Sequence, residues 1–344
     1  YDNTCANKPI LYNNMIAVNY KGGDWYVADK DNKDKNNLWY SYSDKKWANA
    51  VVVKNNKYNN TGMLVDKNDI LGYYVWIPRY KYKTWNVEDS VNDTYKAYDE
   101  GIDIIFENGV NKVNVDSYKN DQYITHPAFG DNLTGFWISK YEISKNDDGY
   151  VSKSDIESYR NDTLDNYKNI INNLTNDYAL GDKASSMIVN NLEWGSVLYL
   201  SHSKYGVCDG DGCSSIGNND TYKAGNNKQD TTTRNVYGVY DMSGSAAEFT
   251  MSNYTETLNE LSLDNSNFTN IPISNKDYDL YYKDTFILGD ATKELSNVTG
   301  TWIDITNNWL ARGGIANQKN SSIFSYSATT DTASNYLTTR IIIK

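Results

Sequence analysis

Short apolar runs separated by turn residues dominate the first part of the chain. The runs 15–20 and 24–28 are rich in Ile, Val, Trp and Tyr, and Lys21-Gly22-Gly23 lies between them. Two such runs joined by a glycine turn predict a β-hairpin. Further apolar runs at 38–42 and 47–53 continue the pattern, so we expect a small all-β module over residues 1–66.

The pattern changes in residues 67–344, where longer strands are followed by two helical segments. Apolar runs at four places predict strands, with a polar loop over 84–100 between two of them: 75–82, 102–106, 136–143 and 336–343. Strands combined with few helices and long loops indicate the α+β class.

Both predicted helices begin at a capping pattern. Ser154 followed by Glu157 predicts a helix whose apolar positions recur as far as Leu174. Asn190 followed by Glu193 predicts the start of the second helix.

Composition narrows the classes of partner. The formal net charge of −11 and the lack of a Lys/Arg cluster argue against nucleic acid and anionic membranes as partners. Aromatic residues make up 14% of the chain, including 31 Tyr, which indicates a folded core in spite of the many Asn, Ser and Thr. The chain begins with Tyr1, so we expect a signal peptide or an anchor upstream of it.

Three cysteines are present, and two of them are close in sequence. Cys208 and Cys213 lie five residues apart, which allows a disulfide within a turn, as expected in an exported protein. Cys5 has no evident mate. Calcium binding by this loop remains an alternative, because Asp209 and Asp211 lie between the two cysteines. We expect no other metal or cofactor.

Catalytic constellations are scarce. Two histidines, His126 and His202, stand alone, which argues against a zinc hydrolase or a His-based triad. Glu142 and Glu248 lie in apolar surroundings and are either a glycosidase acid pair or buried structural carboxylates; the second interpretation is favoured. We expect no catalytic residues.

Five sequence blocks, in order, resemble the formylglycine-generating-enzyme (sulfatase-modifying-factor) family. They are Val75-Trp76-Ile77-Pro78, Phe136-Trp137-Ile138-Ser139-Lys140-Tyr141-Glu142-Ile143-Ser144, Asn191-Leu192-Glu193-Trp194-Gly195, Asn235-Val236-Tyr237-Gly238-Val239-Tyr240-Asp241-Met242-Ser243-Gly244 and Trp309-Leu310-Ala311-Arg312-Gly313-Gly314. The resemblance implies a C-type-lectin-like fold for residues 67–344. Enzymes of the family use two reactive cysteines near the C-terminus, whereas this chain has no cysteine after Cys213. The resemblance therefore implies a non-catalytic member.

Some domains of this family belong to proteins that retroelements diversify, and there the segment after Arg-Gly-Gly carries the ligand-binding surface. The matching segment here is 315–335, rich in Asn, Ser, Thr and Tyr as the whole chain is. Alternation predicts that Ser322, Phe324 and Tyr326 share one face, on which Phe324 and Tyr326 either contact the ligand or pack inward. The resemblance implies these ligand-binding residues: Trp309, Ile315, Asn317, Asn320, Ser322, Phe324, Tyr326, Thr330 and Asn335.

The sequence thus predicts an extracellular or surface-displayed protein that binds a protein or glycan ligand on another cell or surface. The alternative is a structural subunit that self-assembles into an extracellular filament or virion through an upstream segment. A divergent enzyme is a third interpretation, which the missing cysteines disfavour.

Overall fold

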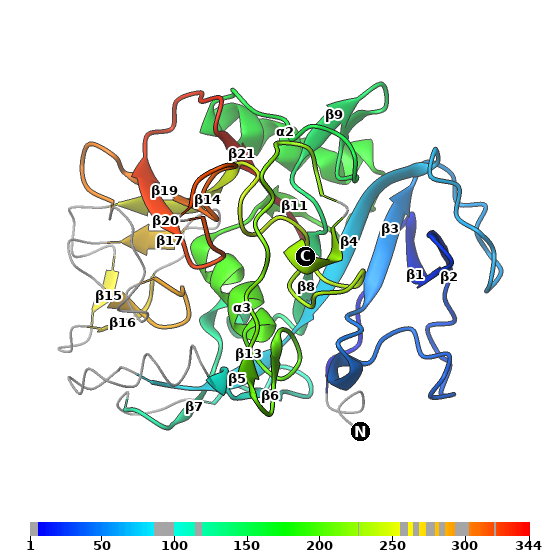
Figure 1. Ribbon diagram of the computed structural model, residues 1–344, viewed down its shortest axis with the longest axis horizontal. Helices are drawn as coiled ribbons and strands as arrows, with labels where there is room; N and C mark the ends of the chain where they lie inside the picture. Colours follow the sequence, from blue (N-terminus) through cyan, green and yellow to red (C-terminus); the bar gives the residue numbers. More distant parts are fainter. Residues whose placement is uncertain are drawn as a thin grey trace.

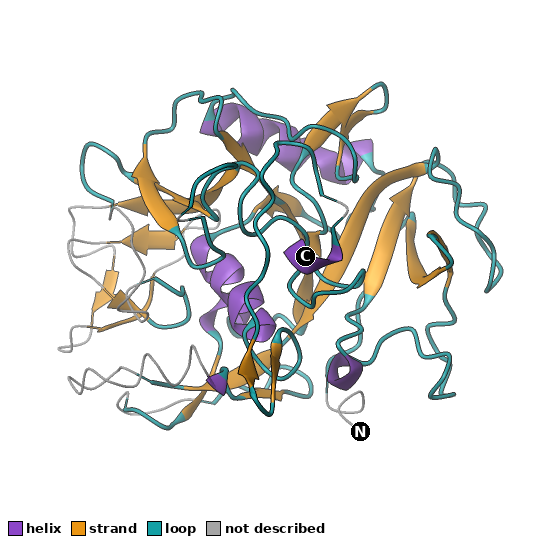
Figure 2. Ribbon diagram, viewed as in Figure 1, coloured by secondary structure: helices purple, strands orange, loops and turns teal. Residues whose placement is uncertain are grey.

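The computed structural model describes residues 6–85, 100–113, 119–225, 227–254, 261–263, 268–272, 279–281, 286–292, 303–319 and 321–344. Cys5, Asn320 and most of the loop predicted over 84–100 lie outside these ranges. The described residues are mostly strand and loop with two α-helices, an α+β arrangement (Figures 1 and 2).

A seven-stranded sheet, antiparallel throughout, forms the centre of the fold. Side chains alternate across it: Val52 and Trp76 pack with the helices, and Val51 and Tyr73 pack on the other face. In spatial order its strands are β11 (Ser186–Ile188), β22 (Ile341–Ile343), β8 (Gly135–Ser139), β4 (Ile70–Pro78), β3 (Asn49–Val53), β1 (Met15–Lys21) and β2 (Asp24–Val27).

The N-terminal strands belong to this same sheet. The predicted hairpin is confirmed: β1 pairs with β2 across Gly22 and Gly23, whose φ angles of 61° and 102° suit glycine. β3 pairs with β4, so the boundary predicted at residue 66 falls between two hydrogen-bonded neighbours.

The strand predicted over 38–42 is wrong. Its part of the chain forms one isolated bridge at Ser41 and then the 3₁₀ turn η2 (Tyr42–Asp44). The cause is burial of its aromatic side chains: the Trp39 indole donates to the Asn49 carbonyl at 2.8 Å, and the Tyr42 hydroxyl to that of Trp76 at 2.7 Å. The segment therefore packs over the sheet without extending it.

Helix α3 (Asn191–Ser201) confirms the second capping prediction. The Glu193 amide donates to Asn190 Oδ1 at 2.7 Å, and the Asn190 amide donates to the Glu193 carboxylate at 2.9 Å. Every residue of α3 is buried. Gly195 allows this, because a Cβ there would lie 2.0 Å from the Gly289 carbonyl oxygen.

Helix α2 (Leu164–Asp177) begins later than predicted. Its N-cap is Thr163, whose hydroxyl accepts the Asn166 amide at 3.2 Å, and the Ser154–Glu157 segment is not helical. Asp155 and Asn161 adopt left-handed φ angles of 62° and 65°, which interrupt a right-handed helix.

A second sheet carries the C-terminal part of the chain. Its order is β17 (Asp279–Tyr281), β14 (Ala247–Tyr254), β19 (Trp309–Arg312) and β20 (Tyr326–Thr329), and β21 (Leu337–Thr339) pairs with β14. The predicted strand 336–343 is thus split between two sheets. Arg340, at the break, turns its guanidinium into the interior, where it meets Glu248.

Neither α-helix of the described structure has the length and apolar character that crossing a membrane would require.

Smaller elements complete the described structure. The smaller elements are β5 (Tyr80–Lys83), β6 (Ile104–Phe106), β7 (Tyr123–Thr125), β9 (Ser144–Asn146), β10 (Gly149–Val151), β12 (Cys208–Asp209), β13 (Gly212–Cys213), β15 (Leu261–Leu263), β16 (Phe268–Pro272), β18 (Phe286–Ile287), η3 (Pro127–Phe129) and η4 (Lys228–Asp230).

Candidate ligand-binding face

Arg312, the last residue of β19, anchors the segment that follows it. Its fully buried guanidinium donates to the Asn191 side chain at 2.7 Å and to the carbonyls of Asp290, Ala291 and Ser325 at 2.8, 2.9 and 3.1 Å. Burial lowers the pKa of Arg312 to about 10, so the group remains charged at neutral pH. Four acceptors around one buried cation fix the position of this end of the segment.

Two glycines then turn the chain back on itself. Gly313 and Gly314 have φ angles of 88° and 74°, and a Cβ on Gly314 would lie 2.5 Å from Ser321 Oγ. That hydroxyl donates to the Ile315 carbonyl at 2.6 Å, which closes a compact loop. We call residues 313–336 the C-terminal face, which Figure 1 shows in orange and red beside β14.

The C-terminal face exposes polar side chains between anchored ends. Its far end runs into β21 and β22, in which every residue is buried. Between these anchors many described side chains are exposed to solvent: those of Asn317, Gln318, Lys319, Ser327, Asp331, Thr332, Ala333, Asn335 and Tyr336.

The nine residues predicted for ligand binding do not share one environment. Asn317 and Asn335 are exposed; Trp309, Ile315, Ser322, Tyr326 and Thr330 are half-buried; and Asn320 lies outside the described residues. Phe324 is only 5% exposed and packs edge-on against His202, with ring centroids 5.2 Å apart.

Phe324 is therefore part of the interior and not an exposed anchor. The predicted alternation over Ser322, Phe324 and Tyr326 also fails, because 322–325 form a turn and β20 begins only at Tyr326. A hydrogen bond from the Ser325 amide to the Ser322 carbonyl at 2.9 Å holds that turn.

A cavity of about 270 Å³ lies beside the C-terminal face. It is rich in hydroxyl groups, with an apolar side made by Ile216, Ile323 and Phe324. Other lining residues are His202, Cys213, Ser214, Ser215, Asn218, Ser243, Ser321 and Ser322. Sequence reasoning missed most of them, because they come from four separate parts of the chain between residues 202 and 324.

The disulfide predicted between Cys208 and Cys213 is confirmed, and it joins the two strands of the β12–β13 hairpin. This hairpin leads into the segment 213–216 that lines the cavity. His202 lies close to both sulfurs, but sulfurs bonded to each other are not the thiolates that metals bind. Within the loop, the Asp209 carboxylate accepts the Asp211 amide at 3.0 Å.

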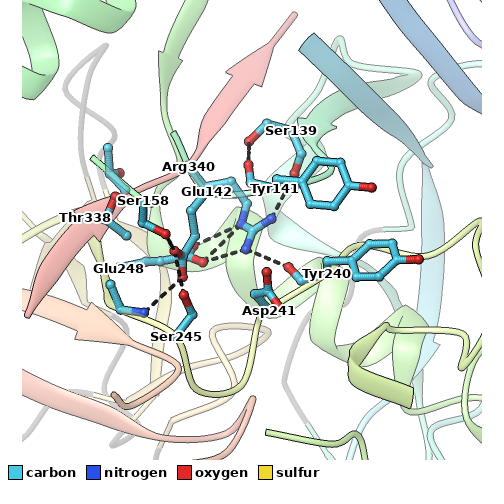
Figure 3. A network of polar contacts seen from close by, with 12 residues as sticks. Ser139, Tyr141, Glu142, Ser158, Tyr240, Asp241, Ser245, Glu248, Thr338 and Arg340 are labelled. Atoms are coloured by element: carbon cyan, nitrogen blue, oxygen red, sulfur yellow. Dashed lines mark hydrogen bonds and ion pairs between the residues drawn. The ribbon is translucent and has the colours of Figure 1, made fainter. Parts of the chain in front are cut away.

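Glu142 and Glu248 lie in a buried polar network around Arg340, drawn in Figure 3. Arg340 binds the Glu248 carboxylate through Nη2 at 2.6 Å and Nε at 3.0 Å, and donates to the carbonyls of Ser139 and Tyr240. All three charged side chains are fully buried. This placement fits the structural interpretation of the two carboxylates.

The hydrogen-bond donors to Glu142 are uncharged groups. Its carboxylate accepts the hydroxyls of Ser158 and Ser245, the latter at 3.0 Å, and the Ala246 amide at 3.2 Å. Burial raises the pKa of Glu142 well above its usual value, and the neighbouring Glu248 raises it further. The network thus joins two of the five resembling blocks, through Ser139 and Glu142 in one and Tyr240 in the other.

No family model matches the chain, and none of the curated proteins matches it. Among solved structures the chain is similar to Treponema denticola variable protein 1, with a TM-score of 0.33 and 12% sequence identity. The alignment covers 68% of this chain and 92% of that one. A TM-score this low is no basis for assigning a fold, a family or a function.

Proposed function

We propose that the chain is an extracellular ligand-binding protein whose C-terminal face contacts a protein or glycan on another cell or surface. One observation carries the proposal: both ends of this face are fixed in the core, while the described side chains between them are mostly polar and many are exposed. Loops held on a rigid scaffold are where recognition residues concentrate. Exposed Asn, Ser and Thr are also side chains that can be exchanged at little cost in stability.

The scaffold in this proposal is a C-type-lectin-like fold of the formylglycine-generating-enzyme type. Its support is the order of the five resembling blocks together with two buried networks: Arg312 contacts the block that contains Asn191, and Arg340 joins the blocks that contain Ser139 and Tyr240. Diversification of the face by a retroelement belongs to the same proposal. A near-copy of the codons for residues 310–340 beside a reverse-transcriptase gene would support it, and a flanking sequence without one would contradict it.

The proposed protein has no catalytic role. The support is the sequence, which has no cysteine after Cys213, and the burial of Glu142 and Glu248 away from any substrate. The resembling oxidases need soft sulfur ligands for copper, and only Met242 and Met251 supply sulfur in residues 214–344.

The test is to find the ligand and map where it binds. The labelled chain is incubated with arrays of glycans and cell-surface proteins, and the complex with the strongest ligand is examined by amide hydrogen exchange. We expect protection within residues 313–336 and in the cavity-lining segment 213–218. Protection confined to other surfaces would overturn the assignment of this face.

A further inference from the structure

A second hollow, which we call the aromatic pocket, lies on the sheet face that the helices do not cover. It has a volume of about 380 Å³, within the range of roughly 300–1,000 Å³ typical of small-molecule sites. It is built from β1, β2, β4 and segments far along the chain. Figure 1 shows β1 and β2 on the side of the molecule opposite β19 and β20. Its lining comprises Tyr20, Gly23, Trp25, Lys67, Tyr73, Tyr141, Lys153, Ser154, Asp155, Lys228, Val236 and Tyr240.

Five aromatic rings form one continuous wall of this pocket. Tyr20 contacts Trp25, Trp25 contacts Tyr73, Tyr73 contacts Tyr141 and Tyr141 contacts Tyr240, with centroid distances of 5.2, 6.2, 5.9 and 5.1 Å. Two of these pairs are edge-on and two are tilted, so none of them is a parallel stack. Aromatic side chains that line a pocket can pack against the C–H surfaces of a non-planar ring such as a pyranose.

Lys140 packs against two rings of the aromatic wall. Its fully buried ammonium donates to Asn49 Oδ1 at 2.7 Å and to the Gly238 carbonyl at 2.9 Å. The same nitrogen lies 5.2 Å from the Trp25 ring centroid and 5.6 Å from that of Tyr240. This contact fixes two of the five rings in place.

Phenol hydroxyls supply the polar contacts. Tyr73, Tyr141 and Tyr240 carry phenol groups that are protonated at neutral pH, and burial raises their pKa values further. The Ser154 side chain hydrogen-bonds with the Tyr141 hydroxyl. Hydroxyls along an aromatic wall match a ligand that itself carries several hydroxyl groups.

The lysines that line the pocket favour an anionic ligand. Its lining contains Lys67, Lys153 and Lys228 against one carboxylate, Asp155, although the whole chain carries a net charge of −11. Lys67 also pairs with Asp24 at 3.1 Å and Asp155 with Lys223 at 3.9 Å. Asp66 and Asp148 act on Lys153, and Asp230 and Asp241 act on Tyr240, so the excess of lysine is confined to the side chains that line the pocket. Lysines at the rim repel the quaternary ammonium ions that aromatic cages otherwise bind.

We propose that the aromatic pocket binds an acidic saccharide, a pyranose that carries a carboxylate or a sulfate, with its ring on the aromatic wall and its anionic group at the lysines. This site is separate from the C-terminal face and does not depend on the function proposed for that face. The aromatic pocket thus gives the protein a second ligand-binding site, which takes acidic saccharides.

The test titrates the full chain with small probes by calorimetry and ligand-observed NMR. The probes are N-acetylneuraminic acid, glucuronic acid, galactose 6-sulfate, glucose, choline and AMP. We expect saturable binding of acidic sugars that weakens as salt is added, and much weaker binding of glucose and choline. The carboxylated and sulfated probes show which anion the lysines prefer.

Variants separate the pocket from other surfaces. The double variant Lys67→Gln and Lys153→Gln should weaken acidic-sugar binding by about tenfold, and Tyr141→Phe, which removes one hydroxyl, should also weaken it. The matched control Lys33→Gln and Lys35→Gln changes two exposed lysines elsewhere and should bind as the parent does.

Three results would overturn the proposal: no saturable binding of any acidic sugar, stronger binding of choline or AMP, or unchanged binding by the double lysine variant. Substitutions on the C-terminal face should leave binding of these probes unchanged. Failure of the pocket is thereby distinguished from failure of the proposed C-terminal face.

Discussion

Arg340 and Glu248 form an ion pair in which neither side chain is exposed to solvent, with Nη2 2.6 Å from Oε1. Arg340 interrupts the C-terminal strand between β21 and β22, and Glu248 lies on β14. The pair therefore connects the second sheet to the strand that enters the main one.

Removing one partner should be costly because it leaves the other charge buried and uncompensated. We expect Arg340→Met to lower the free energy of unfolding by about 3–5 kcal/mol, measured by urea denaturation. The double variant Arg340→Met and Glu248→Met should recover much of that loss. A single variant as stable as the parent would show that the pair does not support the fold.

Asp279 should make stability depend on pH. It is buried at the start of α3, where its carboxylate accepts the Leu192 amide at 3.1 Å, and burial raises its pKa from 3.8 to about 8. Because the folded-state pKa is the higher one, the unfolded chain loses this proton first. The contribution of Asp279 is therefore full below about pH 4 and is lost as pH rises towards about 8.

The variant Asp279→Asn keeps the shape of the side chain and cannot ionise. Its unfolding free energy, relative to the parent, should increase with pH across this window by at most about 1.4 kcal/mol per pH unit. Urea titrations at several pH values measure this difference. A difference that is constant with pH, or that shrinks as pH rises, would contradict the raised pKa.

The bridge between Cys208 and Cys213 should stabilise its hairpin more than the whole fold. For so short a loop, replacing both residues with Ser should cost about 2 kcal/mol. Faster hydrogen exchange should be confined to residues 207–218, next to the cavity. Global unfolding on reduction, or two free thiols in the oxidised protein by intact-mass analysis, would refute this prediction.

The chain should not oxidise cysteine. With copper and a sulfatase-type peptide substrate we expect no formylglycine, because no cysteine follows Cys213. Mass spectrometry of the peptide measures the product. Turnover that persists after both Cys208 and Cys213 are replaced with Ser would reveal an unrecognised active site and sink the non-catalytic proposal.

Local patterns in the sequence predicted those elements whose signals are themselves local. The β1–β2 hairpin follows from its glycine turn, and α3 follows from its capping box, since each signal acts over a few residues. Prediction failed where distant groups decide the conformation. Residues 154–163 have a capping pattern, but the Ser158 hydroxyl is held by the Glu142 carboxylate and Asn161 is left-handed.

The candidate site shows the same division. The Arg312-Gly313-Gly314 block was recognised through its resemblance to a family, and the paired cysteines from their spacing. Phe324 was misplaced because alternation assumes a strand, whereas 322–325 turn and bury the ring against His202. The aromatic pocket gave no sequence signal. The chain contains 31 tyrosines, and the four that line the pocket come from four separate segments.

Comparing two sets of exposed substitutions tests the C-terminal face most directly. Each set changes five exposed residues. The face variant carries Asn317→Gly, Lys319→Ala, Ser327→Ala, Thr332→Ala and Asn335→Ala. The control variant carries Asn36→Ala, Asn55→Ala, Asn56→Ala, Asn59→Ala and Asn60→Ala.

The measurement is the Kd of each variant for the ligand found on the arrays, with the melting temperature recorded in parallel. Surface changes cost under about 0.5 kcal/mol each, so both variants should melt within a few degrees of the parent. The face variant should bind at least about tenfold more weakly, and the control variant should bind as the parent does. Equal binding by the parent and a well-folded face variant would contradict the assignment of ligand binding to residues 313–336.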